Sequence, residues 1–498
     1  MSEPISRRQA LTLGALGLGA VAAGATGLIV GTRSSSPTDS DGSSAAWAEP
    51  QVLTSENGVL ELDLTLAESD VTVGGTTVRM LTYNGTVPGP TLHLRPGDRL
   101  LVHLRNDLDQ PTNLHTHGLM VSADGNSDNP FIRIGPGDTF DYEIVLPDDH
   151  PSGVCWYHPH HHGTVADQLF AGLYGAIIVD EEDWTAGAPR VVVISDVTYR
   201  DGQVAAVTPM ERRAGRTGET LLTNGRIRPA LHAPAGSDER LLLINACSSR
   251  YLDLQLGGLN ARLRGLDSAR LSAPTTADRL LLAPGNRADL VVTVPTAPAD
   301  LVSATYDRGQ MGMGMMGGQS TVSPEETVLS LNPDARAQRS VIADPSPVTA
   351  TDLRDRRADT TRTLTFSMAG GMAGGGGMGN GGMGNGGMGG QFLIDGRAFD
   401  PDRINQTVRP GTVEEWTIAN QSPMNHPFHL HIWPMQLIRK GTVDVADVDV
   451  RDVIDVPARQ SITVRIAFDR FPGRTVYHCH ILDHEDLGMM GVIRMASS

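Results

Sequence analysis

Short runs of apolar residues recur along the chain after residue 50. Examples are "RLLVHLRN", "RLLLINAC", "ADLVVTV" and "SITVRIAF", and Gly, Pro, Asn and Asp residues separate such runs. Runs of this length bounded by turn residues are typical of β-strands. Beyond the N-terminal segment, no long stretch keeps the apolar period of a helix. The pattern therefore predicts an all-β protein built from packed Greek-key sandwiches or barrels.

The length of 498 residues suggests roughly three domains at about 150 residues each. We expect an export signal and linker over residues 1–48, followed by domains over 49–183, 184–345 and 346–498. A weak repeat supports this division. "LHLRPGDRLLVHLRND" in the first domain and "QTVRPGTVEEWTIANQ" in the last both read as strand, Pro-Gly turn, strand, and a histidine cluster follows each. The repeat predicts that these two domains are duplicates.

The N-terminus has the features of a twin-arginine export signal. Arg7 and Arg8 precede a Gly/Ala-rich apolar run from Ala10 to Val30. The signal is imperfect, because such motifs usually have a bulky apolar residue where Ala10 stands, and an uncleaved membrane anchor is the alternative. No later segment has about 18 consecutive apolar residues, so we expect an exported mature protein without a membrane span.

Charge and cysteine content narrow the function. The formal net charge of -17 argues against a nucleic-acid partner, which would require a basic surface. Three cysteines do not make a disulfide framework. Cys155 and Cys247 could pair or stay free, whereas histidines surround Cys479 and make it a candidate metal ligand.

Ten of the 16 histidines are candidate ligands, and they fall in four short motifs, "LHTHG", "WYHPHHHG", "NHPFHLH" and "YHCHILDH". Residues i and i+2 of a strand face the same side, so a His-x-His step aims two imidazoles at one point. Four such pairs give eight imidazoles, which is too many for one metal ion and suits three. The pairs are His115/His117, His158/His160, His429/His431 and His478/His480.

The same period places Cys479 on the opposite side from its two neighbouring histidines, at a separate site. His426 and His484 can complete two nitrogens and one thiolate there, with Met489 as a weak axial ligand. Two His, one Cys and a distant Met form the ligand set of a blue-copper electron-transfer site. The peptide around Cys479 would then connect a one-electron acceptor to the histidine cluster.

The four motifs resemble the copper-binding signatures of the multicopper oxidases, a family that includes laccases and bacterial copper-efflux oxidases. The resemblance extends over roughly residues 50–498 and implies three cupredoxin-like domains and four copper ions. It implies type 1 ligands His426, Cys479, His484 and Met489, type 2 ligands His115 and His429, and type 3 ligands His117, His158, His160, His431, His478 and His480.

The resemblance also suggests proton donors and has two departures. Acidic residues near these motifs supply protons in the family, which makes Glu485 and Asp124 candidates. Thr116 stands where the family often has tryptophan. Ser422 stands where copper-efflux oxidases tend to have an aspartate near a substrate Cu(I), which puts such a site in doubt although Met424 fits their pattern.

Two Met/Gly-rich tracts bear on the electron donor. Thioethers suit Cu(I), so the tracts suggest capture of cuprous ion as substrate and a role in copper tolerance. The methionines concerned are Met311, Met313, Met315 and Met316 in the first tract, and Met368, Met372, Met378, Met383 and Met388 in the loop of residues 368–390. A laccase that oxidises phenols or aromatic amines is the alternative enzyme, with the tracts as flexible spacers. A non-enzymatic copper-sequestering protein is disfavoured because no ligand of the set is missing.

Overall fold

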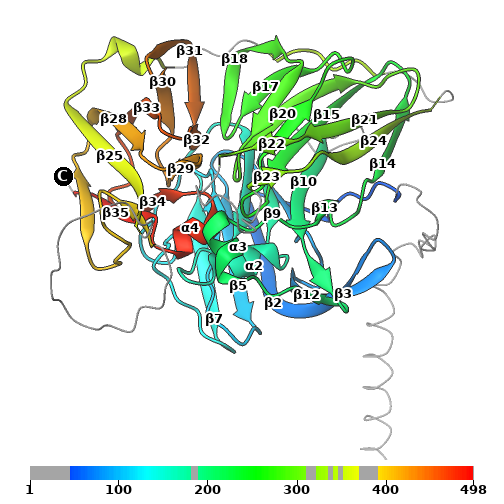
Figure 1. Cartoon of the computed structure of the whole chain (residues 1–498), viewed down its shortest axis with the longest axis horizontal. Coiled ribbons are helices and arrows are strands. Elements are labelled where there is room, and N and C mark those ends of the chain that lie inside the picture. The colour runs from blue at the N-terminus through cyan, green and yellow to red at the C-terminus, as the bar shows by residue number, and fades with distance from the viewer. Residues whose placement is uncertain are drawn as a thin grey trace, which may run out of the picture. The chain divides into compact units, whose positions relative to one another are not determined.

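The computed structural model describes residues 45–180, 189–309, 321–334, 340–345, 351–369 and 391–496, which form an almost entirely β structure (Figure 1). The predicted all-β fold is confirmed. Residues 1–44, which hold most of the predicted export segment, lie outside the described part, and the twin-arginine signal stays a prediction. Within the described residues, no helix has both the length and the apolar character needed to cross a bilayer.

The first sandwich packs two sheets around one core. One sheet has the strand order β1 (Val52–Thr54), β4 (Thr91–Leu94), β9 (Gly175–Val179), β8 (Gly153–His158), β6 (His115–His117). The other has the order β11 (Tyr199–Arg200), β12 (Gln203–Val204), β3 (Thr76–Tyr83), β2 (Val59–Val73), β5 (Arg99–Asn106), β7 (Thr139–Val145). Alternate residues of β2, from Leu60 to Leu66, are buried in the core, as the period of a strand with one covered face requires.

The second sandwich follows in the chain. One sheet has the order β13 (Thr220–Thr223), β10 (Arg190–Val197), β15 (Asp238–Asn245), β20 (Arg287–Thr293), β17 (Arg262–Leu266), β18 (Ala269–Thr276). The other has the order β14 (Ala230–Pro234), β24 (Glu326–Asp334), β21 (Ala299–Ala304), β16 (Leu252–Gln255), β19 (Arg279–Leu282), and β22 (Tyr306–Asp307) pairs separately with β23 (Val322–Ser323).

The third sandwich completes the fold and is drawn in yellow to red in Figure 1. One sheet has the order β26 (Gln391–Ile394), β25 (Thr360–Ala369), β28 (Thr412–Asn420), β33 (Ser461–Phe468), β30 (Met435–Lys440), β31 (Val443–Arg451). The other has the order β27 (Ile404–Val408), β35 (Met490–Met495), β34 (Gly473–Cys479), β29 (His426–Leu430), β32 (Val453–Val456). The helices are α2 (Val165–Phe170), α3 (Pro209–Ala214), α4 (Leu482–Asp486) and the short η1 (Leu353–Asp355).

The first and second sandwiches share an apolar interface. In β8, Cys155 and Tyr157 face the core of the first sandwich, whereas Val154 and Trp156 belong to a separate cluster with residues of β10 and β15. Both faces of β8 and β10 are therefore buried, which explains the continuous apolar runs Val154–Tyr157 and Val191–Ile194 in place of an alternating pattern. The boundaries predicted between the domains stay a prediction.

The repeat seen in the sequence corresponds to a repeated topology. The order β4-β9-β8-β6 in the first sandwich matches β27-β35-β34-β29 in the third. In both, the strand before the Pro-Gly turn pairs in parallel with the last strand of its sandwich's sheet, β4 with β9 and β27 with β35. Equivalent strands therefore carry the histidine motifs of both sandwiches.

Candidate metal centre

The "HCH" motif ends strand β34, and Cys479 faces the core of the third sandwich as the strand period predicts. The Cys479 Sγ lies 3.4 Å from the His426 Nδ1 and 4.0 Å from the His484 Nδ1, and these two nitrogens are 3.2 Å apart. All three residues are fully buried. Met489 is buried beside them, and its carbonyl accepts a hydrogen bond from the Cys479 backbone N–H at 3.0 Å.

The outer nitrogens of both histidines are engaged, so the inner ones keep lone pairs. The His484 Nε2 lies 3.2 Å from the carbonyl of Arg213, which can only accept, so this nitrogen carries the proton. The His426 Nε2 lies 2.8 Å from the Ser422 hydroxyl, which itself donates to the Met424 carbonyl. Burial lowers the pKa of His426 to about 3, so the imidazole is neutral. Two lone pairs and a thiol thus converge on one point, a donor set that suits a soft, redox-active metal ion.

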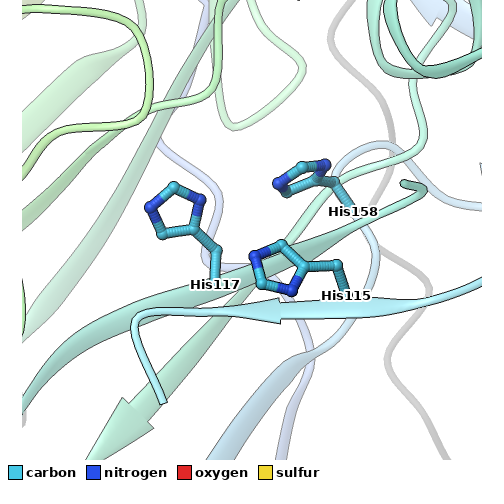
Figure 2. Close-up of side chains that lie close together, drawn as sticks. All are labelled: His115, His117 and His158. Carbon is cyan, nitrogen blue, oxygen red and sulfur yellow. The ribbon is translucent and has the colours of Figure 1, made fainter. Parts of the chain in front are cut away.

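The other eight histidines form a second buried cluster between the first and third sandwiches. His115 of β6 pairs across the sheet with His158 of β8, and His429 of β29 pairs with His478 of β34. Figure 2 shows His115 and His117 on the same side of β6 with His158 beside them. Each of these histidines is at most 2% exposed, and the cluster comprises His115, His117, His158, His160, His429, His431, His478 and His480.

Hydrogen bonds fix the tautomers in this cluster as well. The Nδ1 atoms of His158, His429 and His478 donate to the carbonyls of Pro159, Asp452 and Cys479 at 2.8–3.0 Å, so their Nε2 atoms are lone pairs. The Nε2 atoms of His158 and His429 have no protein partner. Burial and the neighbouring imidazoles hold the pKa of His158 well below its usual value. Burying imidazole nitrogens whose lone pairs have no hydrogen-bond partner costs free energy unless a cation binds them. These histidines therefore suit copper ions.

The structure brings the predicted ligands together in overlapping groups whose donor atoms all lie within 4.8 Å of one another. One group matches a predicted type 3 set, with the His478 Nε2 3.1 Å from the His160 Nε2 and 3.2 Å from the His431 Nε2. On the other predicted type 3 set, the His117 Nδ1 lies 3.3 Å from the His480 Nε2. The groups are His115/His117/His158, His115/His429/His431, His160/His431/His478, His117/His429/Asp452 and His426/Cys479/His484.

The two predicted proton donors are placed differently. Glu485 is completely buried in α4, with its carboxyl oxygens 3.1 Å from the His478 Nδ1 and 3.6 Å from the His160 Nε2. Burial raises the pKa of Glu485 to about 7. Asp124 is exposed and has no contact with the histidine cluster, and its carboxylate packs against Gly473. The structure thus does not support Asp124 as a proton donor.

Asp128, four residues further on, occupies the position expected of Asp124. It is 2% exposed, and its carboxylate lies 2.9 Å from the His115 Nδ1 while accepting from the Thr116 N–H at 2.8 Å. Burial raises its pKa to about 7. The sequence contained both acids in "SADGNSDN", and only the course of the loop decides which one turns inward.

A second carboxylate at the cluster, Asp452, gave no signal in the sequence. Its Oδ1 lies 3.1 Å from the His117 Nε2, and the guanidinium of the fully buried Arg287 holds both of its oxygens at 2.5–2.6 Å. Asp452 lies at the end of the turn between β31 and β32, and Arg287 begins β20 of the second sandwich. The pair therefore connects a copper-cluster histidine to a domain that contributes no histidine to the groups found in the described residues.

The remaining predicted residues divide into described and undescribed ones. Met424 is fully buried, and Met368 is half-buried against the core of the third sandwich. The other methionines of the two tracts, Met311, Met313, Met315, Met316, Met372, Met378, Met383 and Met388, lie outside the described residues. Cys155 and Cys247 are both buried and free rather than paired.

Both family models and individual relatives with similar sequences match this chain to the multicopper oxidases. Multicopper oxidase family models match residues 65–183 and 378–498, the regions that carry all four histidine motifs. A multicopper oxidase of Staphylococcus aureus is 28% identical over 434 residues, covering 83% of each chain. The laccase of Bacillus subtilis is 24% identical, covering 83% of this chain and 89% of its own.

Among solved structures, the multicopper oxidase of Campylobacter jejuni, described as a metallo-oxidase, superposes with a TM-score of 0.76 and 27% identity. The match covers 91% of this chain and 96% of that one, so the cupredoxin-like fold is shared over nearly the whole length. The matched segments contain the ten clustered histidines and Cys479. The chain belongs to the multicopper oxidases and is an oxidoreductase of that family.

Proposed function

We propose that this oxidase holds four copper ions and couples oxidation of Cu(I) to reduction of O2 to water, as a defence against copper. The observation that carries the proposal is a pair of buried donor sets, one with a thiol, joined by a single peptide. Type 1 copper would bind His426, Cys479, His484 and Met489, type 2 would bind His115 and His429, and the type 3 pair would bind His117, His158, His480 and His160, His431, His478. When bound, the coppers supply one-electron oxidation of the donor and four-electron reduction of O2.

The chain connects the two donor sets by its shortest possible covalent path. His478 and His480 flank Cys479 directly, and the His478 Nδ1 donates to the Cys479 carbonyl at 3.0 Å. With copper bound, the thiolate of Cys479 would therefore have both a covalent backbone connection and a hydrogen-bonded connection to the histidine cluster.

Reduction of O2 to water consumes protons beside histidines that are at most 2% exposed, so acidic side chains buried at the cluster are suited to deliver them. Glu485 and Asp128 suit this role, because each has a pKa raised to about 7 and touches a cluster histidine. We therefore assign proton supply to Glu485 and Asp128 and no longer to Asp124.

A matched pair of substitutions tests that assignment. Asp128→Asn keeps the size of the side chain and an oxygen for the Thr116 N–H, so we expect the fold to survive and O2 uptake per bound copper to fall about 10²–10⁴-fold. Asp124→Asn should leave uptake unchanged. The reverse result would return the role to Asp124.

The proposal of Cu(I) as donor rests on where the two Met/Gly tracts leave the described chain. Just before the first tract, Gly309 packs against the backbone of Pro423 and Met424, which are close in sequence to His426. A Cβ placed on Gly309 would lie 3.0 Å from the Met424 Cα. The Asp307 Oδ1 accepts from the Gly309 N–H at 2.9 Å and the Thr321 hydroxyl at 3.3 Å, which ties the two ends of this tract together.

The described residues on either side of the second tract, Met368 and Phe392, lie near the same proposed type 1 site. Met368 of β25 pairs across the sheet with Phe392 of β26, and the Phe392 ring stacks on His484 with 3.8 Å between centroids. The described residues that flank both tracts thus lie near the proposed type 1 histidines, and because thioethers suit Cu(I), this placement favours Cu(I) over an organic donor.

The experiment is O2 uptake by the copper-loaded protein with Cu(I) or a simple phenol as the donor, free Cu(II) being absent. The test variant replaces Met372, Met378, Met383 and Met388 with leucine, which keeps loop length and apolar character; a second variant deletes residues 371–389. We expect Cu(I) turnover to fall in both while phenol turnover holds. Phenol turnover that exceeds Cu(I) turnover in every variant would favour the laccase reading, which relatives with that name also support.

A further inference from the structure

Arg308 is a fully buried arginine that lacks an acidic partner. It is 1% exposed, and its Nη2 donates to the carbonyls of Ala214 and Gly215, the latter at 2.8 Å. Its Nη1 has no hydrogen-bond partner, and no carboxylate lies within ion-pair distance of the guanidinium in the described part of the chain. Because arginine stays protonated in proteins, this is a buried positive charge without compensation.

The other fully buried arginines of this region show what is usual. Arg216 pairs with Asp483 at 2.6 Å, Arg250 with Asp196 at 3.0 Å and Arg287 with Asp452 at 2.5 Å. Asp483 and Asp196 are the two carboxylates that interact electrostatically with Arg308, and each of them already forms an ion pair with another arginine. An unpaired buried charge costs several kcal/mol, so its retention points to a role beyond packing.

The uncompensated charge lies beside the proposed type 1 site. The Arg308 guanidinium and the Ile481 side chain both pack against Gly215. A Cβ placed on Gly215 would lie 2.8 Å from the Arg308 Nη1 and 2.7 Å from the Ile481 Cγ2, so these two atoms are neighbours. The Ile481 N–H in turn points at the Cys479 Sγ at 3.4 Å. On the other side, the Arg308 carbonyl accepts from the Asn425 N–H at 2.7 Å, next to His426.

A buried cation near a redox centre disfavours the more positive of its two oxidation states. Coulomb energies in a protein interior are only weakly screened, so one unit charge across a side chain or two shifts the equilibrium measurably.

We infer that Arg308 is an electrostatic positioning residue that raises the reduction potential of the type 1 site and so sets which donors the enzyme can oxidise. The inference rests on the proposed ligand set of that site. It gives a physical reason for an otherwise costly buried charge and for the C-terminal end of α3, where the carbonyls of Ala214 and Gly215 hold the guanidinium in place.

The test is a redox titration of the blue type 1 absorbance in the copper-loaded full-length protein. Arg308→Met removes the charge at similar volume, and we expect the ratio of oxidised to reduced type 1 copper at a given potential to rise roughly tenfold, equal to a fall of ~59 mV. Arg308→Lys, which keeps the charge, should stay near the wild type. Arg213→Met is the matched control, because Arg213 is a half-buried arginine in the last turn of α3, next to Ala214, and its carbonyl accepts from His484. Its loss should shift the potential less.

An unchanged potential in Arg308→Met, or an equal shift in Arg213→Met, would overturn the inference. If Arg308→Met does not fold, Arg308→Gln keeps a donor for the two carbonyls without the charge and gives the same test. Wild-type protein that binds copper without a blue band would contradict the ligand set itself and thereby the proposed function. A blue wild type with an unmoved variant contradicts only the role of Arg308.

Discussion

Gly285 of the second sandwich packs against the ring of His480 in the histidine cluster, and replacing this glycine gives a specific prediction. Gly285 has φ +85°, and a Cβ there would lie 2.7 Å from the His480 Nε2 and 2.8 Å from its Cε1. Carbon and nitrogen atoms normally stay about 3.5 Å apart, so Gly285→Ala must move the ring by roughly 0.8 Å. The ring has little room, because the His480 Nε2 already lies 3.3 Å from the His117 Nδ1 and the His480 backbone N–H is bound to Pro427.

A displacement near 1 Å at a reacting centre costs on the order of 10²-fold in rate, which is the fall in O2 uptake that we expect. The left-handed conformation adds about 1–2 kcal/mol for any residue with a Cβ. Gly258→Ala is the matched control, because Gly258 also has φ +85° but has no atom within 4 Å of the new Cβ. Copper content, thermal midpoint and O2 uptake are measured for both. Equal uptake by the two variants, at equal copper content, would refute the steric argument.

Three further changes test particular contacts. His103 lies 2.8–2.9 Å from the carboxylates of two neighbouring strands, which raise its pKa to about 9. The stabilisation is complete below its unfolded pKa of about 6.5 and is lost as the pH rises through about 9, so His103→Gln should lower the thermal midpoint at pH 6 and not at pH 10; an equal effect at both would contradict this. Phe392→Ala removes the ring stacked on His484 and should cost about 3–5 kcal/mol, measured as a lower urea midpoint, together with weaker blue absorbance; an unchanged midpoint would disprove it. Arg287→Met strands the buried Asp452 and should cost about 3–5 kcal/mol in the same assay, partly recovered when Asp452→Asn is added; no recovery would argue against the charge as the cause.

The pairing of the histidines and the opposite orientation of Cys479 were predictable from the sequence because strand geometry is periodic. His478 and His480 share one face of β34 and Cys479 takes the other, as an i, i+2 spacing requires. The repeated Pro-Gly phrase likewise predicted that the first and third domains are duplicates, and the strand orders of the two sandwiches match. In both cases local covalent geometry determines the result, so no knowledge of the tertiary fold was needed.

The second layer of the site was not predictable, because it depends on the paths of loops. Asp124 and Asp128 are equivalent by composition and spacing, yet only Asp128 turns toward His115. Asp452 reaches His117 from 335 residues further along the chain. Such contacts follow from how whole sandwiches pack, and a single sequence contains no periodic signal for them.

The second sandwich shows how a domain without ligands can still determine the chemistry. Gly285 limits the position of His480, Arg287 holds Asp452, and the carbonyl of Arg213 fixes the tautomer of His484. These contacts use backbone carbonyls, a missing side chain and salt bridges, none of which belongs to a recognisable copper motif. In the proposed assignment, the ligand motifs mark where copper would bind, whereas these contacts, which lie outside the motifs, hold the ligands in position. Arg308, from the same domain, extends this division of roles from geometry to charge.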